Sequence, residues 1–425
     1  MREIVKGLLL NSPQPIRIAT VLFREWWWKH YALLWEQKHY PALSKKRYKA
    51  SKKIKNILIY HISGMSFGGT EKCLQLIANT LAVKYKVFYL YGNGAVSRER
   101  LDTMEKNITL IPFSYSQNAI SFPHCITEMK PHFKDIITDH NIDLIVTASP
   151  GYSHYPWNII KDIPIILINI FGAPTLQKNI QRCISISNTV REHAEKWTGK
   201  LPKRDVTLYA PLAKMPPANM STLGKELRSK LNIPESDFVF GRIGRNDDGI
   251  FDPIGIRAWH KIAPIHPNVH YVIMSPPPAL IKIIRDDNIP RVHLLPPSGN
   301  EKDVWAFHSA IDAMAHFRRD GETSGVAIAE SLTAGNPIIT HRSHFWNAHL
   351  EYLNEPVALI ADLDNVEEYA AHMESLIKLH ENHPEKWSAL QASARLLGEV
   401  NFSPLQYSAN IQTIIDSIGI KHETY

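Results

Sequence analysis

The sequence predicts two successive α/β domains, each built on a parallel β-sheet. Short apolar runs alternate with amphipathic helical segments in two separate series along the chain. With 425 residues, of which 44% are hydrophobic, the chain is long enough for two cores of ordinary size. A stretch with three prolines at 210–221 separates the two series. These observations favour two Rossmann-like domains joined by a short connection.

The first domain is predicted to span residues 54–210. An apolar run at 57–60 has the character of a buried strand, and a glycine-rich turn and a helix over 71–81 follow it. Further strands are expected at 87–91, 108–111, 144–146, 165–168 and 183–186.

The second domain is predicted to span residues 211–400. Strands are expected at 238–240, 269–274, 292–295, 311–315 and 337–340, again with helices between them. The last segment, 401–425, contains a predicted helix from about 404 to 418.

Residues 1–53 form a basic, aromatic arm ahead of the two domains. Phe23, Trp27, Tyr31 and Leu34 recur at helical spacing. Residues 1–55 carry 13 Lys/Arg against 3 Asp/Glu, a net charge of +10, whereas the rest of the chain has a net charge of −3. We do not expect a nucleic-acid enzyme, because such a protein spreads cations over its working face. Two interpretations remain open: the arm binds an anionic membrane surface, or it packs its aromatic stripe on the catalytic body or a second subunit.

Cysteine content and hydropathy indicate the cellular compartment in which the protein is expected. The three cysteines are far apart and odd in number, which is typical of a reducing environment. No stretch approaches the ~18 consecutive apolar residues of a membrane span, and no secretory signal is recognisable. We therefore expect a cytoplasmic protein, either soluble or peripheral on a membrane.

The strongest chemical signal is a pair of glutamates, Glu322 and Glu330, separated by seven residues. Glu322 follows a predicted strand in a glycine-flanked loop, and a helix is expected to begin near Ser324, Gly325 and Val326. The unpaired amides and positive dipole end of that helix would suit a pyrophosphate. Glu322 would then reach sugar hydroxyls and Glu330 a ribose diol. A capped helix with two solvated glutamates is the structural alternative.

A second motif, Gly68-Gly69-Thr70-Glu71, lies between the predicted strand at 57–60 and its helix. Glycines at such a turn let the backbone approach a phosphate closely. A plain tight turn is the alternative, and the full dinucleotide fingerprint of three glycines is absent, which disfavours an NAD enzyme.

The glutamate pair, with Gly325, Gly335 and Pro337 in register, resembles the donor-binding motif of family-4 retaining glycosyltransferases. That resemblance implies the GT-B fold, in which two Rossmann-like domains face each other across a cleft. It places the nucleotide-sugar donor on the second domain and the acceptor on the first, to which the terminal helix crosses back. It also implies that a Gly-Gly loop such as Gly68-Gly69 closes over the donor diphosphate.

Gly244-Arg245 matches a Gly-Arg step of the same family, in which the arginine binds the donor phosphates. Two departures from the family pattern stand out. The lysine expected about five residues later is replaced by Ile250, so that Arg257 or Lys261 substitutes for it or the phosphate is held with less charge. The histidine expected after the strand at 144–146 is displaced to His154, which either reaches the active site or lies on the surface.

The sequence thus predicts a retaining glycosyltransferase that moves a sugar from a nucleoside-diphosphate donor to a glycan or lipid-linked acceptor hydroxyl. We expect no cofactor, no metal and no nucleic-acid partner. His341, His344 and His349 fit no zinc pattern and are assigned to a polar loop. A catalytically silent GT-B protein that binds a sugar nucleotide or a protein partner is the main alternative, and a nucleotide-sugar epimerase on the same fold is another.

Overall fold

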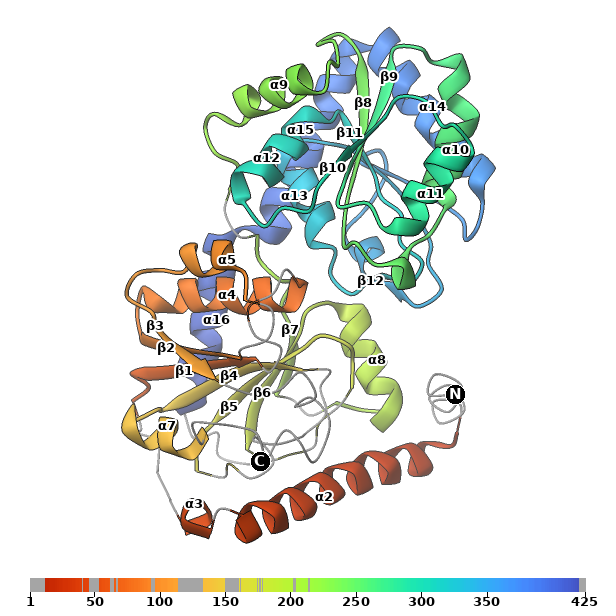
Figure 1. Ribbon diagram of the computed structural model, residues 1–425. Helices are drawn as coiled ribbons and strands as arrows, with labels where there is room; N and C mark the ends of the chain where they lie inside the picture. Colours follow the sequence, from red (N-terminus) through yellow and green to blue (C-terminus); the bar gives the residue numbers. More distant parts are fainter. Residues whose placement is uncertain are drawn as a thin grey trace. The chain divides into compact units, whose positions relative to one another are not determined.

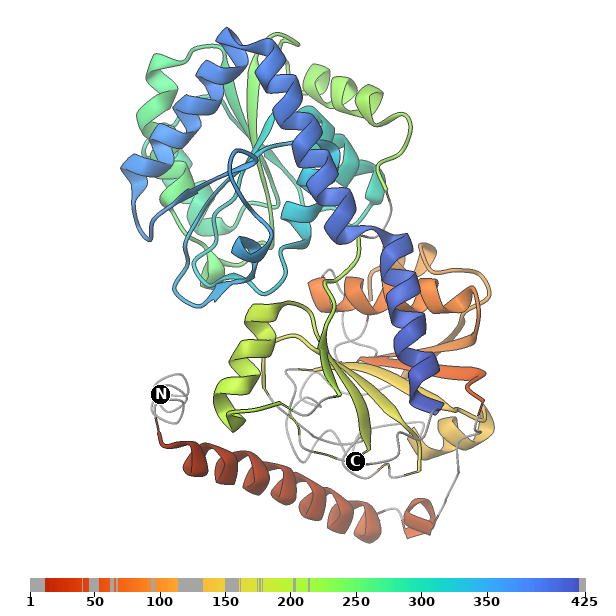
Figure 2. The same ribbon diagram turned by 180° about the vertical axis from the view of Figure 1, so that it is seen from behind.

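The computed structural model describes residues 12–39, 41–45, 53–61, 65, 68–92, 96–113, 133–149, 160, 162–173, 175, 177, 179–201, 204–212 and 215–419. The chain divides into two compact units (Figures 1 and 2). The first unit comprises Met1–Ala210 and Leu405–Tyr425, and the second comprises Pro211–Pro404.

A parallel sheet of seven strands forms the centre of the first unit, in the order β3-β2-β1-β4-β5-β6-β7. The apolar runs of β1 and β5 are buried because helices and loops cover both faces of a parallel sheet. The six predicted strands are present, and β7 is an addition whose polar composition gave no strand signal. The strands are β1 (Asn56–His61), β2 (Lys86–Gly92), β3 (Thr109–Phe113), β4 (Leu144–Ser149), β5 (Ile165–Asn169), β6 (Ile180–Ser185) and β7 (Asp205–Thr207).

Helices of the first unit include α4 (Gly69–Ala82), α5 (Arg98–Asp102), α7 (Phe133–Asp139) and α8 (Asn188–Thr198). The terminal helix α16 (Pro404–Asp416) and the short η4 (Ser417–Gly419) also pack on this unit (Figure 2). The hydroxyl of Tyr85 donates to Asp416 at 3.3 Å, and Arg182 Nη2 donates to Ser417 Oγ at 2.7 Å. Residues 416 and 417 are thereby attached to the first unit.

The basic arm forms α2 (Gln14–His39) and α3 (Pro41–Lys45), and α2 lies against the first unit (Figure 1). Ala32 joins the hydrophobic core of that unit, and the carboxylate of Glu36 pairs with Lys134 Nζ at 2.9 Å. The predicted aromatic stripe is not the packed face, since Phe23 and Leu34 are each 63% exposed. The interpretation that this stripe packs on the catalytic body is therefore wrong. Within the described part of the chain, no helix is long and apolar enough to cross a membrane.

The second unit is built on a parallel sheet of six strands in the order β10-β9-β8-β11-β13-β15. The strand order reverses between β8 and β11, the place where open α/β sheets bind ligands. Five strands were predicted, and β15 was missed because it is a short run at the edge of the sheet. The strands are β8 (Phe238–Ile243), β9 (Val269–Met274), β10 (Val292–Leu295), β11 (Ala313–Ala315), β13 (Ile338–His341) and β15 (Ala358–Ala361), with a separate pair, β12 (Gly321–Glu322) and β14 (Trp346–Asn347).

Helices connect these strands, and the described part of the chain confirms the predicted architecture of two parallel-sheet α/β domains. The core of this unit includes the buried rings of Phe240, Trp259 and Tyr271, which meet edge to face. The helices are α9 (Met220–Lys230), η1 (Asp248–Ile250), α10 (Ile254–Ile262), η2 (Ala263–Ile265), α11 (Pro278–Asp286), α12 (Glu301–Ala310), α13 (Val326–Ala334), η3 (Ala348–Glu351), α14 (Val366–Asn382) and α15 (Pro384–Phe402).

The position of α13 depends on a glycine in the helix behind it. Gly398 of α15 faces α13 so closely that a Cβ atom at this position would lie 2.6 Å from the backbone nitrogen of Thr333. Because backbone atoms cannot rotate away as a side chain can, this contact sets the distance between the two helices. The C-terminal end of α13, where Thr333 lies, is held against α15 by this packing.

We predict that Gly398→Ala lowers the free energy of unfolding by about 2 kcal/mol, since overpacking outweighs the better helix propensity of alanine. Urea denaturation followed by tryptophan fluorescence measures the effect. The matched control is Gly69→Ala in α4, where a Cβ would meet nothing within 4 Å. Equal stability of the two variants would contradict this account of the α13–α15 contact.

Candidate functional site

The loop after β11 presents Glu322 at the carboxyl end of the second sheet. The chain turns at Gly321, whose φ is +69°. A Cβ there would lie 1.8 Å from the carbonyl oxygen of Trp346, so that only glycine fits. The next residue, Glu322, pairs with Asn347 in the short β12–β14 ladder, and its side chain is only 17% exposed.

The buried carboxylate of Glu322 is held by a guanidinium and by a hydrogen bond from an imidazole. His316 Nε2 donates to Glu322 Oε1 at 3.2 Å, and Arg318 Nη1 lies 3.5 Å from the same oxygen. Arg318 also donates to both carboxylate oxygens of Asp320, at 2.6 and 3.0 Å. Burial by itself would raise the pKa of Glu322, but Arg318 and the hydrogen bond from His316 outweigh it and lower the pKa to about 2. At neutral pH this side chain is an ionised hydrogen-bond acceptor.

Neighbouring strands and helices orient these partners. His316 Nδ1 lies 3.0 Å from Thr340 Oγ1, and the hydroxyl of Tyr369 donates to the carbonyl of His316 at 2.9 Å. The amide of Arg318 donates to His341 Nε2 at 3.2 Å, while His341 Nδ1 donates to the carbonyl of Arg342 at 2.8 Å. The ring of His341 is therefore a neutral imidazole with one N–H.

The assignment of three histidines to a polar loop is wrong for two of them. His341 and His349 are buried, with 2% and 0% exposure, because they pack beneath the loop that carries Glu322. Burial, and then the nearby His316, lower the pKa of His349 to about 3. His344 remains half-exposed, with Nε2 at 3.7 Å from Asp364. Among the described residues no group of side chains is arranged as a metal site.

The N-terminus of α13 lies four residues after Glu322. Gly325 precedes the helix with a φ of +85°, and no side chain caps the first turn. A Cβ at Gly325 would lie 2.5 Å from the hydroxyl of Tyr352, which donates to the carbonyl of Ser324 at 2.9 Å. Ser324 is buried, and its Oγ has no partner in the described part of the chain. The amides from Val326 onward and this hydroxyl together form a set of donors suited to an anion.

Glu330 lies inside α13, where it is 5% exposed, with its carboxylate 3.6 Å from His308 Nε2. The structural alternative of two solvated glutamates is therefore wrong. Contact of Glu330 with a ribose diol stays a prediction.

The loop after β8 carries Arg245 and lies beside the Glu322 loop. Arg245 is exposed, and its carbonyl accepts a hydrogen bond from the amide of Asp247 at 3.0 Å. The amide of Arg319 donates to the carbonyl of Ile250 at 3.0 Å, which joins the two loops. The position where lysine was expected is thus adjacent to a second arginine.

Arg242 is a site residue that sequence reasoning missed. It is the penultimate residue of β8 and is 3% exposed, and its guanidinium lies 5.0 Å above the ring of Phe317. Burial lowers its pKa to about 10, and Glu322 is among the charges that act on it. Its Nη1 has no hydrogen-bond partner in the described structure, while Nη2 lies 3.0 Å from where a Cβ of Gly244 would be. The earlier glycine–arginine step, Gly241-Arg242, was the available signal.

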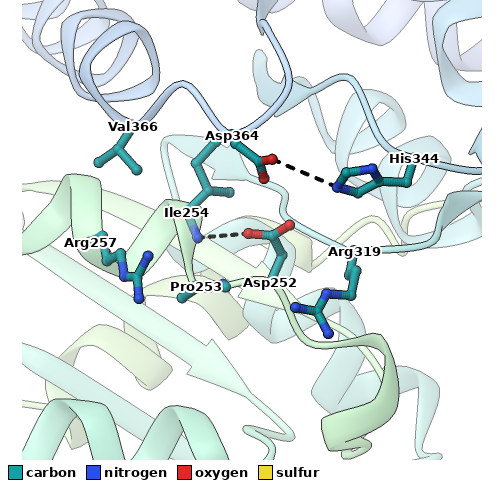
Figure 3. A pocket seen from close by; sticks show the side chains of 8 residues that line it. All are labelled: Asp252, Pro253, Ile254, Arg257, Arg319, His344, Asp364 and Val366. Atoms are coloured by element: carbon teal, nitrogen blue, oxygen red, sulfur yellow. Dashed lines mark hydrogen bonds and ion pairs between the residues drawn. The ribbon is translucent and has the colours of Figure 1, made fainter.

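A pocket of about 320 Å³ opens at the carboxyl ends of the strands, beside these loops (Figure 3). The side chains of Arg257 and Arg319 line it and form no ion pair with another described residue, whereas Lys261 is paired with Glu367. Of the two cations weighed as substitutes for the missing lysine, only Arg257 lines this pocket. The complete lining is Asp252, Pro253, Ile254, Arg257, Arg319, His344, Asp364 and Val366.

In the first unit, Gly68 and Gly69 begin α4 after β1. Gly68 occupies the capping position with extended backbone, and a Cβ on it would collide with the carboxylate of Glu71. Gly69 is exposed and has free space around its Cα. His61, which ends β1 and lies near the charge of Glu71, was not singled out from the sequence. The other predicted catalytic residue, His154, lies outside the described residues.

Residues 225–391 match the family model described as glycosyl transferases group 1. The matched residues lie within the second unit. The fold of the chain is similar to that of HepE from Anabaena, solved with UDP and glucose: TM-score 0.65, 17% identity, 86% of this chain and 100% of that one. A glycosyltransferase from Rickettsia africae gives a TM-score of 0.65 at 12% identity, over 86% of this chain and 99% of the other.

WaaG, a glycosyltransferase involved in lipopolysaccharide biosynthesis, gives a TM-score of 0.62 at 14% identity, over 84% of this chain and 99% of the other. No curated protein matches the chain. The likenesses confirm the predicted GT-B fold, and the narrower assignment to family 4 stays a prediction.

We predict that His349 makes the protein sensitive to acid. Its pKa is about 3 in the folded state against 6.5 for the ordinary side chain. Between pH 6.5 and pH 3 the imidazole is therefore protonated in the unfolded chain but neutral in the folded chain. Stability contributed by the neutral ring is complete above pH 6.5 and is lost as the pH falls toward 3. His349→Gln, whose amide can still donate to the carbonyl of His341, should reduce this loss by on the order of 1 kcal/mol or more.

Urea unfolding at a series of pH values measures the effect. The control, His344→Gln at the half-exposed position, should follow the wild type. A His349→Gln protein that loses as much stability as the wild type between pH 6.5 and 3 would contradict the burial of a neutral ring.

Proposed function

We propose that this protein is a retaining glycosyltransferase that moves a sugar from a nucleoside-diphosphate donor to a hydroxyl of a glycan or lipid-linked acceptor. The observation that carries the proposal is that a buried, ionised Glu322 lies just ahead of the uncapped N-terminus of α13, within the segment that matches the glycosyl transferases group 1 model. The carboxylate suits sugar hydroxyls and the helix end suits phosphates. Retention of configuration follows from the resemblance to family-4 enzymes.

The donor diphosphate would lie on the amides after Gly325 and on Ser324 Oγ. Cleavage of the sugar–phosphate bond builds negative charge on the leaving diphosphate, and stabilising that charge is the main catalytic requirement. Arg245 is exposed at the neighbouring loop and can turn to it, and Arg242 adds a buried positive charge below the same loop. These protein cations support transfer that is independent of a metal.

Glu322 is better suited to orient the sugar than to act as acid or nucleophile. With a pKa of about 2 it carries no proton to donate at neutral pH. The contacts with Arg318 and His316 that keep it ionised also reduce its basicity and thus its nucleophilicity. Hydrogen bonds from sugar hydroxyls to this fixed acceptor would set the anomeric carbon in position.

UDP-glucose is the first donor to test, because HepE has been solved in complex with UDP-glucose. We assign the donor to the second unit and the acceptor to the first. Gly68 and Gly69 would let the backbone of α4 approach the diphosphate, and His154 keeps a proposed catalytic role from its sequence position alone. We propose a cytoplasmic location from the cysteine content.

A catalytically silent sugar-nucleotide binder is the second candidate, and Ile250 in place of lysine is the observation that favours it. Release of UDP from UDP-glucose with and without candidate acceptor glycans separates the candidates. A glycosyltransferase releases UDP in an acceptor-dependent way. A hydrolysing epimerase transfers the sugar to water and so releases UDP without an acceptor, and a silent protein releases none.

Replacement of Arg245 tests the phosphate site. We expect Arg245→Ala to weaken UDP binding by about 1.5–3 kcal/mol, the value of a charge-assisted hydrogen bond. Ile250→Lys should bind as well as the wild type or more tightly, because it restores a cation at the same loop. Titration calorimetry measures both, and wild-type affinity in Arg245→Ala would place the phosphates elsewhere.

Replacement of the two glutamates should affect different kinetic constants. Glu322→Gln keeps the shape but removes the charge, and we expect turnover to fall by about a hundredfold as the sugar loses its orientation. Glu330→Ala should mainly raise the KM for the donor. Steady-state kinetics on the acceptor-dependent reaction provides both values, and unchanged constants in both variants would refute the site.

A further inference from the structure

The outward face of α2 is an apolar surface that nothing in the described structure covers. Phe23 is 63% exposed, Trp26 52% and Trp27 48%. We call this surface the aromatic face of α2; its exposed apolar side chains are Ile16, Leu22, Phe23, Trp26, Trp27 and Leu34.

The aromatic face is continuous and lies opposite the packed side of the helix. The rings of Trp27 and Tyr31 stack at 5.4 Å with an interplanar angle of 11°, and those of Phe23 and Trp26 stack at 6.0 Å. Val21 and Ala32, half a turn around the helix, are fully buried against the first unit. Packing of the arm therefore uses one side of α2 and leaves its most hydrophobic side in water. Such a patch marks a binding surface.

The acidic residues of α2 lie on its packed side, whereas the basic ones are divided: Arg17 and Arg24 are half-buried and two lysines are exposed. Both of its acidic residues, Glu25 and Glu36, are buried, with 8% and 1% exposure. Lys29 and Lys38 are exposed. The solvent side of the helix thus carries positive charge and aromatic rings, within a segment whose net charge is +10 over residues 1–55.

We propose that the aromatic face of α2 docks on an anionic lipid bilayer, with the helix lying in the plane of the interface. Indole and phenyl rings favour the headgroup boundary, and nearby lysines are attracted to anionic lipids. A second copy of the same face is a poorer occupant, because it would bring one basic segment against another. This inference does not depend on the donor chemistry proposed above.

Flotation of the full-length protein with lipid vesicles tests the proposal. The wild type should float with vesicles of phosphatidylcholine mixed with phosphatidylglycerol, should bind pure phosphatidylcholine weakly, and should lose binding as salt is raised. Phe23→Gln, Trp26→Gln and Trp27→Gln combined should lower the partition onto anionic vesicles by about tenfold or more. Lys29→Gln with Lys38→Gln should weaken binding to the anionic vesicles only.

The matched control removes three exposed apolar side chains outside the arm. Val83→Gln, Leu396→Gln and Val400→Gln combined should float like the wild type, since these side chains are 84%, 61% and 66% exposed on α15 or at the end of α4. A melting temperature equal to that of the wild type shows that the triple arm variant is folded. Equal flotation of arm and control variants, or no flotation of the wild type, would overturn the proposal. A wild-type dimer that the arm variant converts to a monomer, without vesicle binding, would assign the face to a second copy.

Discussion

The loops at the carboxyl ends of the strands in the second unit are arranged around one constraint: the buried, charged carboxylate of Glu322 must have partners that compensate its lost hydration. An isolated buried charge is expensive, and Glu322 is tolerated because the Arg318 guanidinium compensates its charge and His316 donates a hydrogen bond to it. Arg318 and His316 are in turn held in place by contacts with Asp320, Thr340 and Tyr369. Residues of β11, β12, β13 and α14 are thus joined by a single network at the carboxyl ends of the strands.

This network explains why the site is suited to hydroxyl recognition next to a phosphate. The ionised carboxylate accepts hydrogen bonds, and four residues later the chain enters the first turn of α13, where donors predominate. Acceptor and donors are therefore side by side on one short segment, and Gly398 packs the far end of α13 against α15. The cationic charge around it is distributed differently from the family pattern: Ile250 is neutral, whereas Arg242 lies buried below the loop and Arg319 is bonded to the backbone of Ile250.

The sequence predicted the features that depend on local pattern. Apolar runs gave eleven of the thirteen strands in the two main sheets, and glycines around Glu322 gave the loop that leads into α13. Features that depend on which residues the fold brings together were missed. His316, His341 and His349 have no local signature, because it is the packing of β11, β13 and η3 that buries them. Likewise the spacing in α2 predicted its aromatic stripe, but only tertiary packing shows that Val21 and Ala32 form the buried side.

A crystal structure of the protein with UDP-glucose would test the central claim most directly, namely that the Glu322 loop and the start of α13 form the donor site. The account predicts the diphosphate on the amides after Gly325, within hydrogen-bonding distance of Ser324 Oγ, and glucose hydroxyls donating to the Glu322 carboxylate. It would be contradicted by a nucleotide bound away from α13, or by a sugar that leaves Glu322 bonded only to Arg318 and His316.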